Sequence, residues 1–501
     1  MTLDRRTLLK TTAAGAAAGP FAGLVAAPAH ADPDPTRLVP VKDKRDGVVR
    51  LHLPRGFRYR SFHDTEQPVT LTDGTSLPGF HDGMAAFDGP GKTVLLVRNH
   101  EVNKPQDHFG PGRPYDAMAG GGTTTVQVTK KGKVIRSFTS LNGTMMNCSG
   151  GPMPWGSWIT CEETVNGPDV GPDFTGTSNV PLEQRHGYVY EVPASRFPGR
   201  GQSNRRPIRS AGRFAHEAVA FDPEGGCLYL TEDNFGFASG FYRYTPPNDP
   251  MEDGYIADRG KLHMLKVRGV DNAHLEGHQV QGTVYDVEWV EIDEPDVEYP
   301  YTPGSPASTP NNTALTHVSS QGWGKGAAYF SRLEGQIYSP EDETIYFTST
   351  NGGGEPEVGT KAGPYGNGIG QVWAYDPEEE TLRVVFQSTD DMKLELPDNI
   401  TTSSGGTLVV CEDGPADNYL RGLTPDGRIF DIGLNRLRSS GGTERFGDEF
   451  AGSTFSPDGH TLFVNIQSTN GMTFAIWGPW DELEGFDDDG DDDEDDDRDD
   501  D

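Results

Sequence analysis

The stretch NCSGGPMPWGSWITCEET, from Asn147 to Thr164, has the pattern of a β-hairpin whose two ends carry different metal ligands. It begins with a thiol, Cys148, and passes through a turn rich in Pro and Gly into a short apolar run. It ends on two acids, Glu162 and Glu163. The ends of a hairpin return to one place, where a thiolate suits iron or zinc and a carboxylate suits calcium or magnesium. The other interpretation is a buried structural cysteine beside a solvated acid pair.

The same pattern recurs along the chain. Six segments consist of a short strand, a turn rich in Gly, Pro or Asp, and a more apolar strand. A repeated unit of this kind, too small to bury its own faces, is typical of a β-propeller. We therefore expect an all-β fold: a single six-bladed β-propeller with long insertions, of which 248–310 is the longest. The six units begin near His81, Asn147, His216, Leu333, Pro397 and Phe450.

Composition favours the same fold class and excludes other functions. The 501 residues include 64 glycines and 38 prolines, which is more than a mainly helical protein carries. The formal net charge of −34 argues against a nucleic-acid partner, because binding a polyanion requires a basic face. Thirteen of the last fifteen residues are acidic, so we expect 483–501 to form a disordered acidic tail.

The first 31 residues have the pattern of an export signal. Arg5 and Arg6 precede an Ala-rich apolar stretch, and Ala29-His30-Ala31 supplies a cleavage pattern. We interpret 1–31 as a twin-arginine signal peptide, which makes the twin-arginine export machinery a partner and leaves 32–482 as the catalytic propeller domain. No second apolar run reaches the ~18 residues of a membrane span. We expect a monomer in the periplasm, at the cell surface or outside the cell.

One position of each unit carries residues that bind metals. In five of the six units the residue one step into the first strand is an acid or the thiol Cys148, and in the sixth it is Ala451. The first strand of a propeller blade lines the central channel, so these positions form a ring at one mouth of the channel. Converging carboxylates repel one another unless cations neutralise them, and we therefore predict bound metal; a water-filled acidic mouth is the alternative. The acids are Asp82, Glu217, Glu334 and Asp398.

Acid pairs end several of the second strands. Side chains alternate along a strand, so one member of each pair faces the site, and the sequence does not say which. Oxygen ligands at these positions suit calcium. The pairs are Glu162-Glu163, Glu232-Asp233 and Glu412-Asp413.

A cation accompanies the predicted ring. Arg332 lies two residues before Glu334, and therefore on the same side of the strand if the strand begins that early. A guanidinium beside clustered metals suits an oxyanion such as phosphate, and a plain Arg–carboxylate pair is the alternative. The Gly-rich runs 120–122 and 352–354 lack the strand–loop–helix context and the lysine of a phosphate-binding loop.

These motifs resemble the PhoX-type alkaline phosphatases. The resemblance rests on the Cys148–Glu163 segment and on Arg332-Leu333-Glu334-Gly335, and it extends over 81–480. Further motifs that carry it are Tyr346–Gly353, Pro397–Asn399, Cys411–Gly414 and Phe450–Gln467.

The resemblance implies a secreted propeller phosphatase that hydrolyses phosphate monoesters at a cluster of Fe(III) and Ca²⁺. It implies that Arg332 binds the phosphate. The family also uses a lysine before the cysteine segment, and here Lys130 and Lys131 lie in a surface hairpin pattern. The implied ligands of iron, or bridges from iron to calcium, are Cys148, Glu217, Glu334 and Asp398, and Glu163 is an implied ligand of calcium. Further candidates are Glu232 or Asp233 and Glu412 or Asp413. The predicted ring at the channel mouth adds Asp82.

Two other functions fit the same expected fold. A calcium-dependent propeller hydrolase of another type, such as a lactonase or a phytase-like enzyme, needs no thiol. A non-enzymatic propeller that binds ligands or partners at the cell surface needs no resident metal, and its acidic tail would serve as a calcium-dependent tether.

Overall fold

The structure is a computed structural model that describes residues 36–357 and 365–484. The predicted export signal, 1–31, lies outside these residues, and so does 485–501 of the predicted tail. The described chain is all-β, with strands throughout and a few short helices, which confirms the expected fold class. Among the helices of the described ranges, none has the length and apolarity that crossing a bilayer requires.

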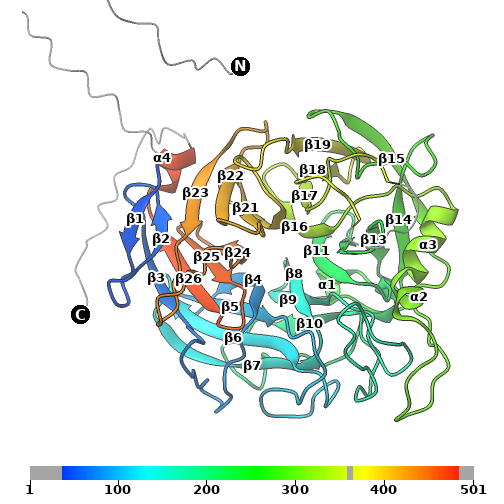
Figure 1. The fold of residues 1–501 in the computed structure, drawn as a ribbon, viewed down its shortest axis with the longest axis horizontal. Helices are drawn as coiled ribbons and strands as arrows, with labels where there is room; N and C mark the ends of the chain where they lie inside the picture. Colours follow the sequence, from blue (N-terminus) through cyan, green and yellow to red (C-terminus); the bar gives the residue numbers. More distant parts are fainter. Residues whose placement is uncertain (1–35, 358–364, 485–501) are drawn as a thin grey trace, which may run out of the picture. The chain divides into compact units, whose positions relative to one another are not determined.

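Within residues 36–357 and 365–484, six inner strands surround a central axis (Figure 1). Each contacts the next in chain order and the last contacts the first, so the strands close a ring. All are first strands of the predicted hairpins, paired antiparallel with the strand that follows. The arrangement is therefore propeller-like. The inner strands are β4 (His81–Asp88), β8 (Asn147–Met153), β11 (His216–Asp222), β16 (Leu333–Ser339), β20 (Pro397–Thr402) and β24 (Phe450–Phe455).

Outer strands pair in turn beside each inner strand, farther from the axis. We call an inner strand together with its outer strands a module. The outer strands of the first three modules are β5 (Thr93–His100), β6 (Gly121–Thr129), β7 (Val134–Thr144), β9 (Ser157–Glu162), β10 (Val189–Pro193), β12 (Cys227–Glu232), β13 (Phe241–Thr245), β14 (Lys261–Val267) and β15 (Val284–Glu291). Those of the last three are β17 (Thr344–Ser349), β18 (Gln371–Asp376), β19 (Thr381–Gln387), β21 (Leu408–Glu412), β22 (Tyr419–Leu423), β23 (Ile429–Asn435), β25 (Thr461–Ile466) and β26 (Met472–Trp477).

Hydrogen bonding groups the described strands into five sheets, and not into the six separate blades expected from the sequence. The difference arises because β15 pairs with β19, with Asp286 opposite Thr381. This pairing joins the third and fourth modules into one nine-stranded sheet. The two strands that it connects, β15 and β19, lie far apart in the sequence, so no local sequence pattern indicates the pairing.

Three N-terminal strands complete the outer edges of the last two modules. They are β1 (Val39–Lys42), β2 (Val49–Leu53) and β3 (Arg58–Phe62). The strand β3 pairs with β26, and β2 pairs with β23. The N-terminal strands of the described chain thus pair with strands near its C-terminal end. They cover two sheet edges, whose backbone groups would otherwise be unpaired. These three strands precede the first predicted unit, which begins at His81, and their pairings were not predicted from the sequence.

Neighbouring sheets pack face to face through apolar side chains. Between the fifth and sixth modules, Val409 and Leu420 lie in one buried cluster with Leu462 and Phe474. Every position of β25 is buried, because both faces of the strand are covered. Burial of one such side chain stabilises the fold by about 1.5–3 kcal/mol. This packing holds the inner strands in fixed positions around the axis.

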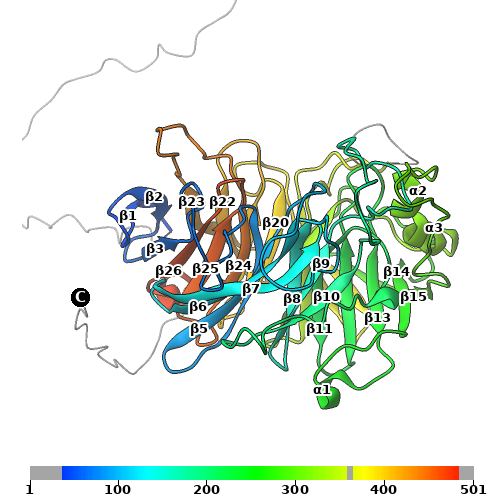
Figure 2. The ribbon, with the colours of Figure 1, turned by 90° about the horizontal axis from the view of Figure 1, so that it is seen from below.

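The predicted insertion 248–310 contains regular structure. It holds α1 (Pro250–Asp253), β14 and β15, and its last part docks on the second module, where Arg185 Nη1 lies 2.7 Å from Asp296 Oδ1. Figure 2 shows α1 at one end of the strands and α2 towards the other. The helices that follow the insertion are α2 (Asn311–Leu315) and α3 (His317–Gly324), and a single 3-10 turn, η1, spans Arg209–Ala211.

The folded region extends slightly beyond the expected boundary at 482. The helix α4 spans Trp480–Glu484, and Leu483 is buried in the apolar cluster of the last two modules. The Trp480 ring meets the Phe57 ring edge to face, with centroids 4.7 Å apart. The first residues of the predicted acidic tail therefore belong to the packed fold.

Candidate functional site

Each inner strand has a β-bulge close to its N-terminal end. In β4 the pairing moves from His81 to Met84 while the partner strand advances by only two residues, so Asp82 and Gly83 together lie opposite Asn99. A bulge bends the strand and redirects a side chain that regular pairing would point elsewhere. The first residues of the six bulges are Asp82, Cys148, Glu217, Glu334, Asp398 and Gly452.

Five of these six residues are predicted ligands, and the sixth module differs from the rest. Its bulge places Gly452, and not the expected Ala451, at the shared position. Gly452 has a φ of 60°, and a Cβ there would lie 2.4 Å from the Asp82 carbonyl oxygen. This position therefore has no room for a side chain, and the ring of ligands has a gap at β24.

The predicted ligands come together in two groups that share one member. Ligand atoms of Cys148, Glu163 and Glu217 lie within 4.8 Å of one another, and so do those of Glu217, Glu334 and Asp398. All are buried except Glu163, which is partly exposed. Side chains from four inner strands, and from the residue that follows the second strand β9, thus meet at Glu217.

Hydrogen bonds between modules hold the backbone of these ligands. Asn99 Nδ2 donates to the Cys148 carbonyl at 3.0 Å. Thr231 Oγ1 donates to the Glu334 carbonyl at 2.6 Å, and an equivalent bond of 2.6 Å joins Thr348 to Asp398. Each donor lies opposite the bulge of its own module and reaches the bulge of the next. The spacing of the ligands is therefore set by a contact that recurs around the ring.

The acid pairs at the ends of the second strands divide between two roles. Glu232 accepts hydrogen bonds from Gly240 N at 2.9 Å and Tyr242 Oη at 2.7 Å, within its own module. Glu412 pairs with Arg421 Nε at 2.8 Å. The structure therefore does not bring the predicted ligands Glu232 and Glu412 to the group around Glu217, because strand alternation directs them away. Their neighbours Asp233 and Asp413 face that group instead, as Glu163 does.

Two acids of the site, Glu101 and Glu449, are absent from the predicted ligand set. Gln467 Nε2 donates to Asp82 Oδ2 at 2.9 Å and to Glu101 Oε2 at 2.7 Å, which places Glu101 beside the ring. Glu101 follows its second strand as Glu163, Asp233 and Asp413 follow theirs, so the repeat contains a signal for it. Glu449 immediately precedes β24, and the residues immediately before the other five inner strands are not acidic, so the repeat gives no signal for it.

We call the acids that act on one another by charge the acid cluster. Burial, followed by the charge of neighbouring carboxylates, raises the pKa of Asp82 and Glu217 well above the usual range. The same causes raise the pKa of Asp398 to about 7 and that of Glu101 to about 8. A bound cation reverses this electrostatic effect. The members are Asp82, Glu101, Glu163, Glu217, Asp233, Glu334, Asp398, Asp413 and Glu449.

The thiol of Cys148 lies inside this cluster. It is buried, and burial together with the charges of Glu217 and Glu163 raises its pKa well above the usual value. A thiol surrounded by carboxylates becomes a thiolate when a cation replaces its proton. The donor set of one thiolate and many carboxylates fits iron together with calcium.

Arg332 is the basic residue that forms ion pairs with the acid cluster in the described chain. Its Nη2 donates to Asp233 Oδ2 at 2.8 Å and to Glu334 Oε1 at 2.6 Å. Its backbone has a φ of 42°, in the left-handed region that residues with a Cβ rarely adopt. The residues just before three other inner strands, Phe80, Met146 and Leu396, share this conformation, so it belongs to the repeat. Lys130, which the sequence places in a surface hairpin, lies at the β6–β7 turn, at the end of the strands away from the acid cluster, and pairs with Asp458.

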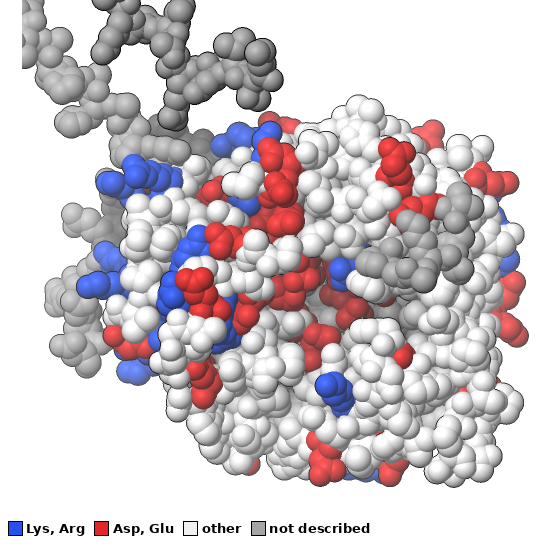
Figure 3. All heavy atoms as spheres, in the orientation of Figure 1, with Lys and Arg blue, Asp and Glu red and all other residues white. Residues whose placement is uncertain are grey.

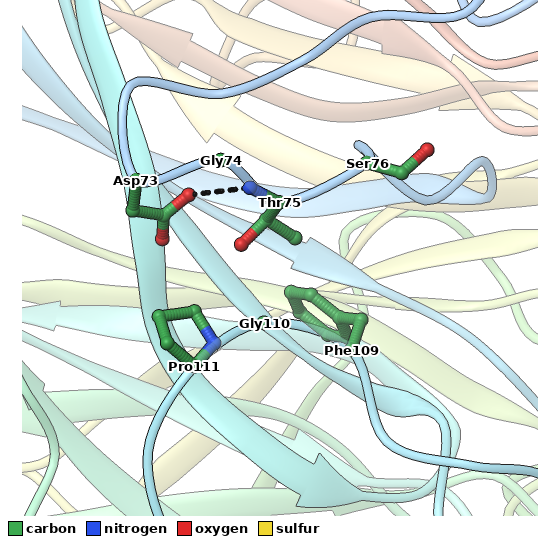
Figure 4. Close-up of a pocket in the computed structure, with 7 residues that line it drawn as sticks. All are labelled: Asp73, Gly74, Thr75, Ser76, Phe109, Gly110 and Pro111. Atoms are coloured by element: carbon green, nitrogen blue, oxygen red, sulfur yellow. Dashed lines mark hydrogen bonds between the residues drawn. The ribbon is translucent and has the colours of Figure 1, made fainter.

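The acidic side chains gather around the hollow near the centre of the ring (Figure 3). A cavity of about 300 Å³ opens beside Glu163 and Asp233. A second hollow, of about 390 Å³, lies between the turn 73–76 and residues 109–111 (Figure 4). Its one carboxylate among the described residues, Asp73, accepts hydrogen bonds from the backbone amides of Thr75 and Thr139, and it lies apart from the acid cluster.

The comparisons with known proteins match most of the chain. The family model for alkaline phosphatase PhoX matches residues 36–138 and 131–470. Among solved structures, the chain is similar to Pseudomonas fluorescens PhoX in complex with vanadate, a transition state analogue. That match has a TM-score of 0.62 and 19% identity, and covers 88% of this chain and 97% of that chain, which shows a shared fold.

Two weaker structural likenesses have no bearing on activity. A catalytically inactive virginiamycin B lyase from Staphylococcus aureus with quinupristin gives a TM-score of 0.36 at 12% identity, covering 84% of this chain and 99% of that chain. A gluconolactonase from Xanthomonas campestris gives a TM-score of 0.35 at 13% identity, covering 83% of this chain and 97% of that chain. The comparison with curated proteins finds no match.

Proposed function

The chain belongs to the alkaline phosphatase PhoX family and is a phosphatase, and on that premise we propose that it hydrolyses phosphate monoesters at the acid cluster. The observation that carries the proposal is the meeting of Cys148 with Glu217, Glu334 and Asp398 from four inner strands. Carboxylates so close together require cations, and a site rich in cations is suited to a phosphoryl group.

We assign two kinds of metal to the two kinds of donor. We assign iron to the thiolate of Cys148 and to Glu217, which both groups share, together with Glu334 and Asp398 of the second group. We assign calcium to the remaining carboxylates of the acid cluster. When bound, the cations neutralise the acid cluster and stabilise charge on the phosphoryl group as Lewis acids. The calcium ligands in this assignment are Glu163, Asp233, Asp82, Glu101, Asp413 and Glu449.

Arg332 binds the phosphoryl oxygens in this proposal. Asp233 and Glu334 hold the guanidinium beside the acid cluster, so it needs little rearrangement to meet a substrate. A planar guanidinium can offer two parallel N–H donors to one phosphate. Arg332 thus orients the ester and stabilises the charge that develops as the ester bond breaks.

The experiment that tests the function is a phosphomonoester assay on the full-length protein with chelation and metal addition. We expect activity to disappear on complete chelation and to return only when iron and calcium are both restored. Undiminished hydrolysis by the metal-free protein contradicts the proposal. The remaining candidate, a calcium-dependent hydrolase of another type, predicts that calcium alone restores activity and that Cys148→Ser has no effect.

We further propose that the nine-stranded sheet corresponds to two blades joined at their outer edge, so that the scaffold is a six-bladed propeller. The six inner strands in a closed ring support this interpretation. We also propose that the monomeric protein leaves the cytoplasm by the twin-arginine route and acts in the periplasm, at the cell surface or outside the cell. Replacing Arg5 and Arg6 by lysine should retain it in the cytoplasm if this is correct.

A further inference from the structure

The cavity beside the acid cluster has a mixed lining. Glu163 and Asp233 belong both to this lining and to the cluster. Much of the remaining lining is apolar, and it comes from the loops that follow β9 and β12, from α2, and from the residues just before β8 and β11. The apolar residues are Met146, Val165, Phe174, Ala215, Phe235, Phe237 and Leu315. A phosphate group bound at the cluster would therefore place its organic part among apolar side chains.

Two aromatic rings of this cavity are exposed and nearly parallel. Phe174 is 81% exposed and Phe235 is 49% exposed. Their ring centroids lie 6.3 Å apart, with 28° between the ring planes. Aromatic rings left open to solvent in one small region mark a binding surface more often than an isolated exposed side chain does. A flat ring can stack on the free face of either phenylalanine.

Phe235 lies next to Arg332, the residue proposed to bind the phosphate. The guanidinium carbon of Arg332 lies 5.8 Å from the centroid of the Phe235 ring. Phe235 follows Asp233 by two residues, and Asp233 is itself bound by Arg332. The distance between Arg332 and the Phe235 ring is thus short enough for one small ester to contact both.

The charges of the lining exclude one class of substrate. The charged residues lining the cavity in the described chain are the acids Glu163, Asp173 and Asp233. A second anionic group on the organic part would be repelled, because opposing charges that could pair with it are missing from this lining. The amides of Asn311 and Asn312 instead offer neutral hydrogen-bonding groups at the edge of the cavity.

We propose that this cavity selects phosphate monoesters whose alcohol carries a planar, uncharged aromatic ring, as in aryl or nucleoside monophosphates, with Phe174 as the specificity-determining residue. The inference rests on the proposed function, because it assumes that the phosphate occupies the acid cluster. Phe174 is 81% exposed and Phe235 49%, so Phe174 offers the larger free face to a ligand ring, and a change at Phe174 leaves the contact between Phe235 and Arg332 in place.

The test compares two phosphonates that the enzyme does not hydrolyse. Calorimetry on the metal-loaded full chain gives the dissociation constants of phenylphosphonate and methylphosphonate, and we expect the phenyl compound to bind more tightly. Phe174→Ala should reduce this preference roughly three- to tenfold, the size of one aromatic stacking contact, and Phe174→Tyr should keep it. Phe197→Ala is the matched control, because Phe197 is 46% exposed but does not line the cavity, and its preference should equal that of the wild type.

An equal preference in the wild type and in Phe174→Ala overturns the inference, and so does a wild type that binds both phosphonates equally. A parallel assay with an aryl phosphate and glycerol phosphate separates this result from the proposed function. A phenyl preference that depends on Phe174, without hydrolysis of either ester, supports the cavity and contradicts the function. Hydrolysis of both esters without a phenyl preference supports the proposed function and contradicts the role of the cavity. If neither phosphonate binds, both the proposed function and the role of the cavity are contradicted.

Discussion

Thr231 Oγ1 donates a hydrogen bond to the backbone carbonyl of Glu334 at 2.6 Å, although the two residues lie in different modules of the ring. Thr231 is fully buried, so water does not replace this bond if it is lost. The hydroxyl of one module therefore fixes the position of a proposed ligand in the next.

Thr231→Val tests this relationship. The valine has nearly the same shape but leaves the buried carbonyl without its donor, which costs about 1–3 kcal/mol of unfolding free energy. Misplacement of Glu334 should also lower kcat/KM for a phosphate monoester by roughly 10- to 100-fold. Thr231→Ser, which keeps the hydroxyl, is the control. A valine variant as stable and as active as the wild type would show that the bond does not position the ligand.

The neighbouring acids Glu412 and Asp413 provide a paired prediction. Glu412 is buried against Arg421 Nε, so Glu412→Gln removes a buried charge-assisted hydrogen bond, although Asp431 still pairs with the guanidinium; the change should cost about 1.5–3 kcal/mol of stability. Asp413→Asn should instead lower calcium content and activity, because Asp413 faces the acid cluster. Denaturant unfolding and calcium analysis of both variants check the assignment. The reverse pattern, with calcium lost only in Glu412→Gln, would mean that the strand faces are assigned wrongly.

Part of this site could be predicted because its ligands repeat. Cys148, Glu217, Glu334 and Asp398 share one position after the start of an inner strand, and the bulge turns all of them toward one another. The choice between members of an acid pair could not be predicted, because one residue of register reverses which side chain faces the site. Glu449 could not be predicted, because no other module has an acid immediately before its inner strand.

The fold shows the same division between local and distant interactions. The six hairpins are local patterns of apolar strands and turn residues, and all six form. The pairing of β15 with β19 and that of β3 with β26 join distant segments at sheet edges. Edge strands pair through backbone groups that every sequence possesses, so the residues of these strands do not identify their partners.

The buried His186 should make stability depend on pH. Its Nδ1 lies 2.6 Å from Glu162 Oε1, and its Nε2 lies 3.4 Å from Asp116 Oδ2. Burial lowers the pKa of His186, but the charge of Glu162 and the contact with Asp116 outweigh burial and raise it to about 9. Because this exceeds the ordinary value of 6.5, the stabilisation is fully present below pH 6.5 and is lost as the pH rises through about 9.

The measurement is the unfolding free energy of the wild type and His186→Gln at pH 6 and at pH 9.5. We expect the wild type to lose about 3 kcal/mol more than the variant between these pH values, which corresponds to the shift in the His186 pKa. Curves that run parallel for the two proteins would mean that His186 is not protonated between its two carboxylates.

Removal of metal should destabilise the protein as well as inactivate it. The buried carboxylates of the acid cluster raise one another's pKa, so they repel when no cation lies among them. A ligand present at a hundred times its Kd stabilises a fold by about 2.7 kcal/mol, and in a chain of this size the loss of one such ion should lower Tm by roughly 3 °C. Differential scanning calorimetry before and after chelation measures this change. An unaltered Tm would favour a binding propeller without resident metal.

The central claim is that Cys148 and the surrounding carboxylates hold iron in a working phosphatase. Anomalous diffraction at the iron absorption edge, on crystals of protein with measured phosphomonoesterase activity, tests it most directly. The account predicts an iron peak at bonding distance from Cys148 Sγ and beside Glu217, absent from Cys148→Ser, with Cys227→Ser unchanged as the control. A fully active wild-type crystal without an iron peak at Cys148 would contradict it.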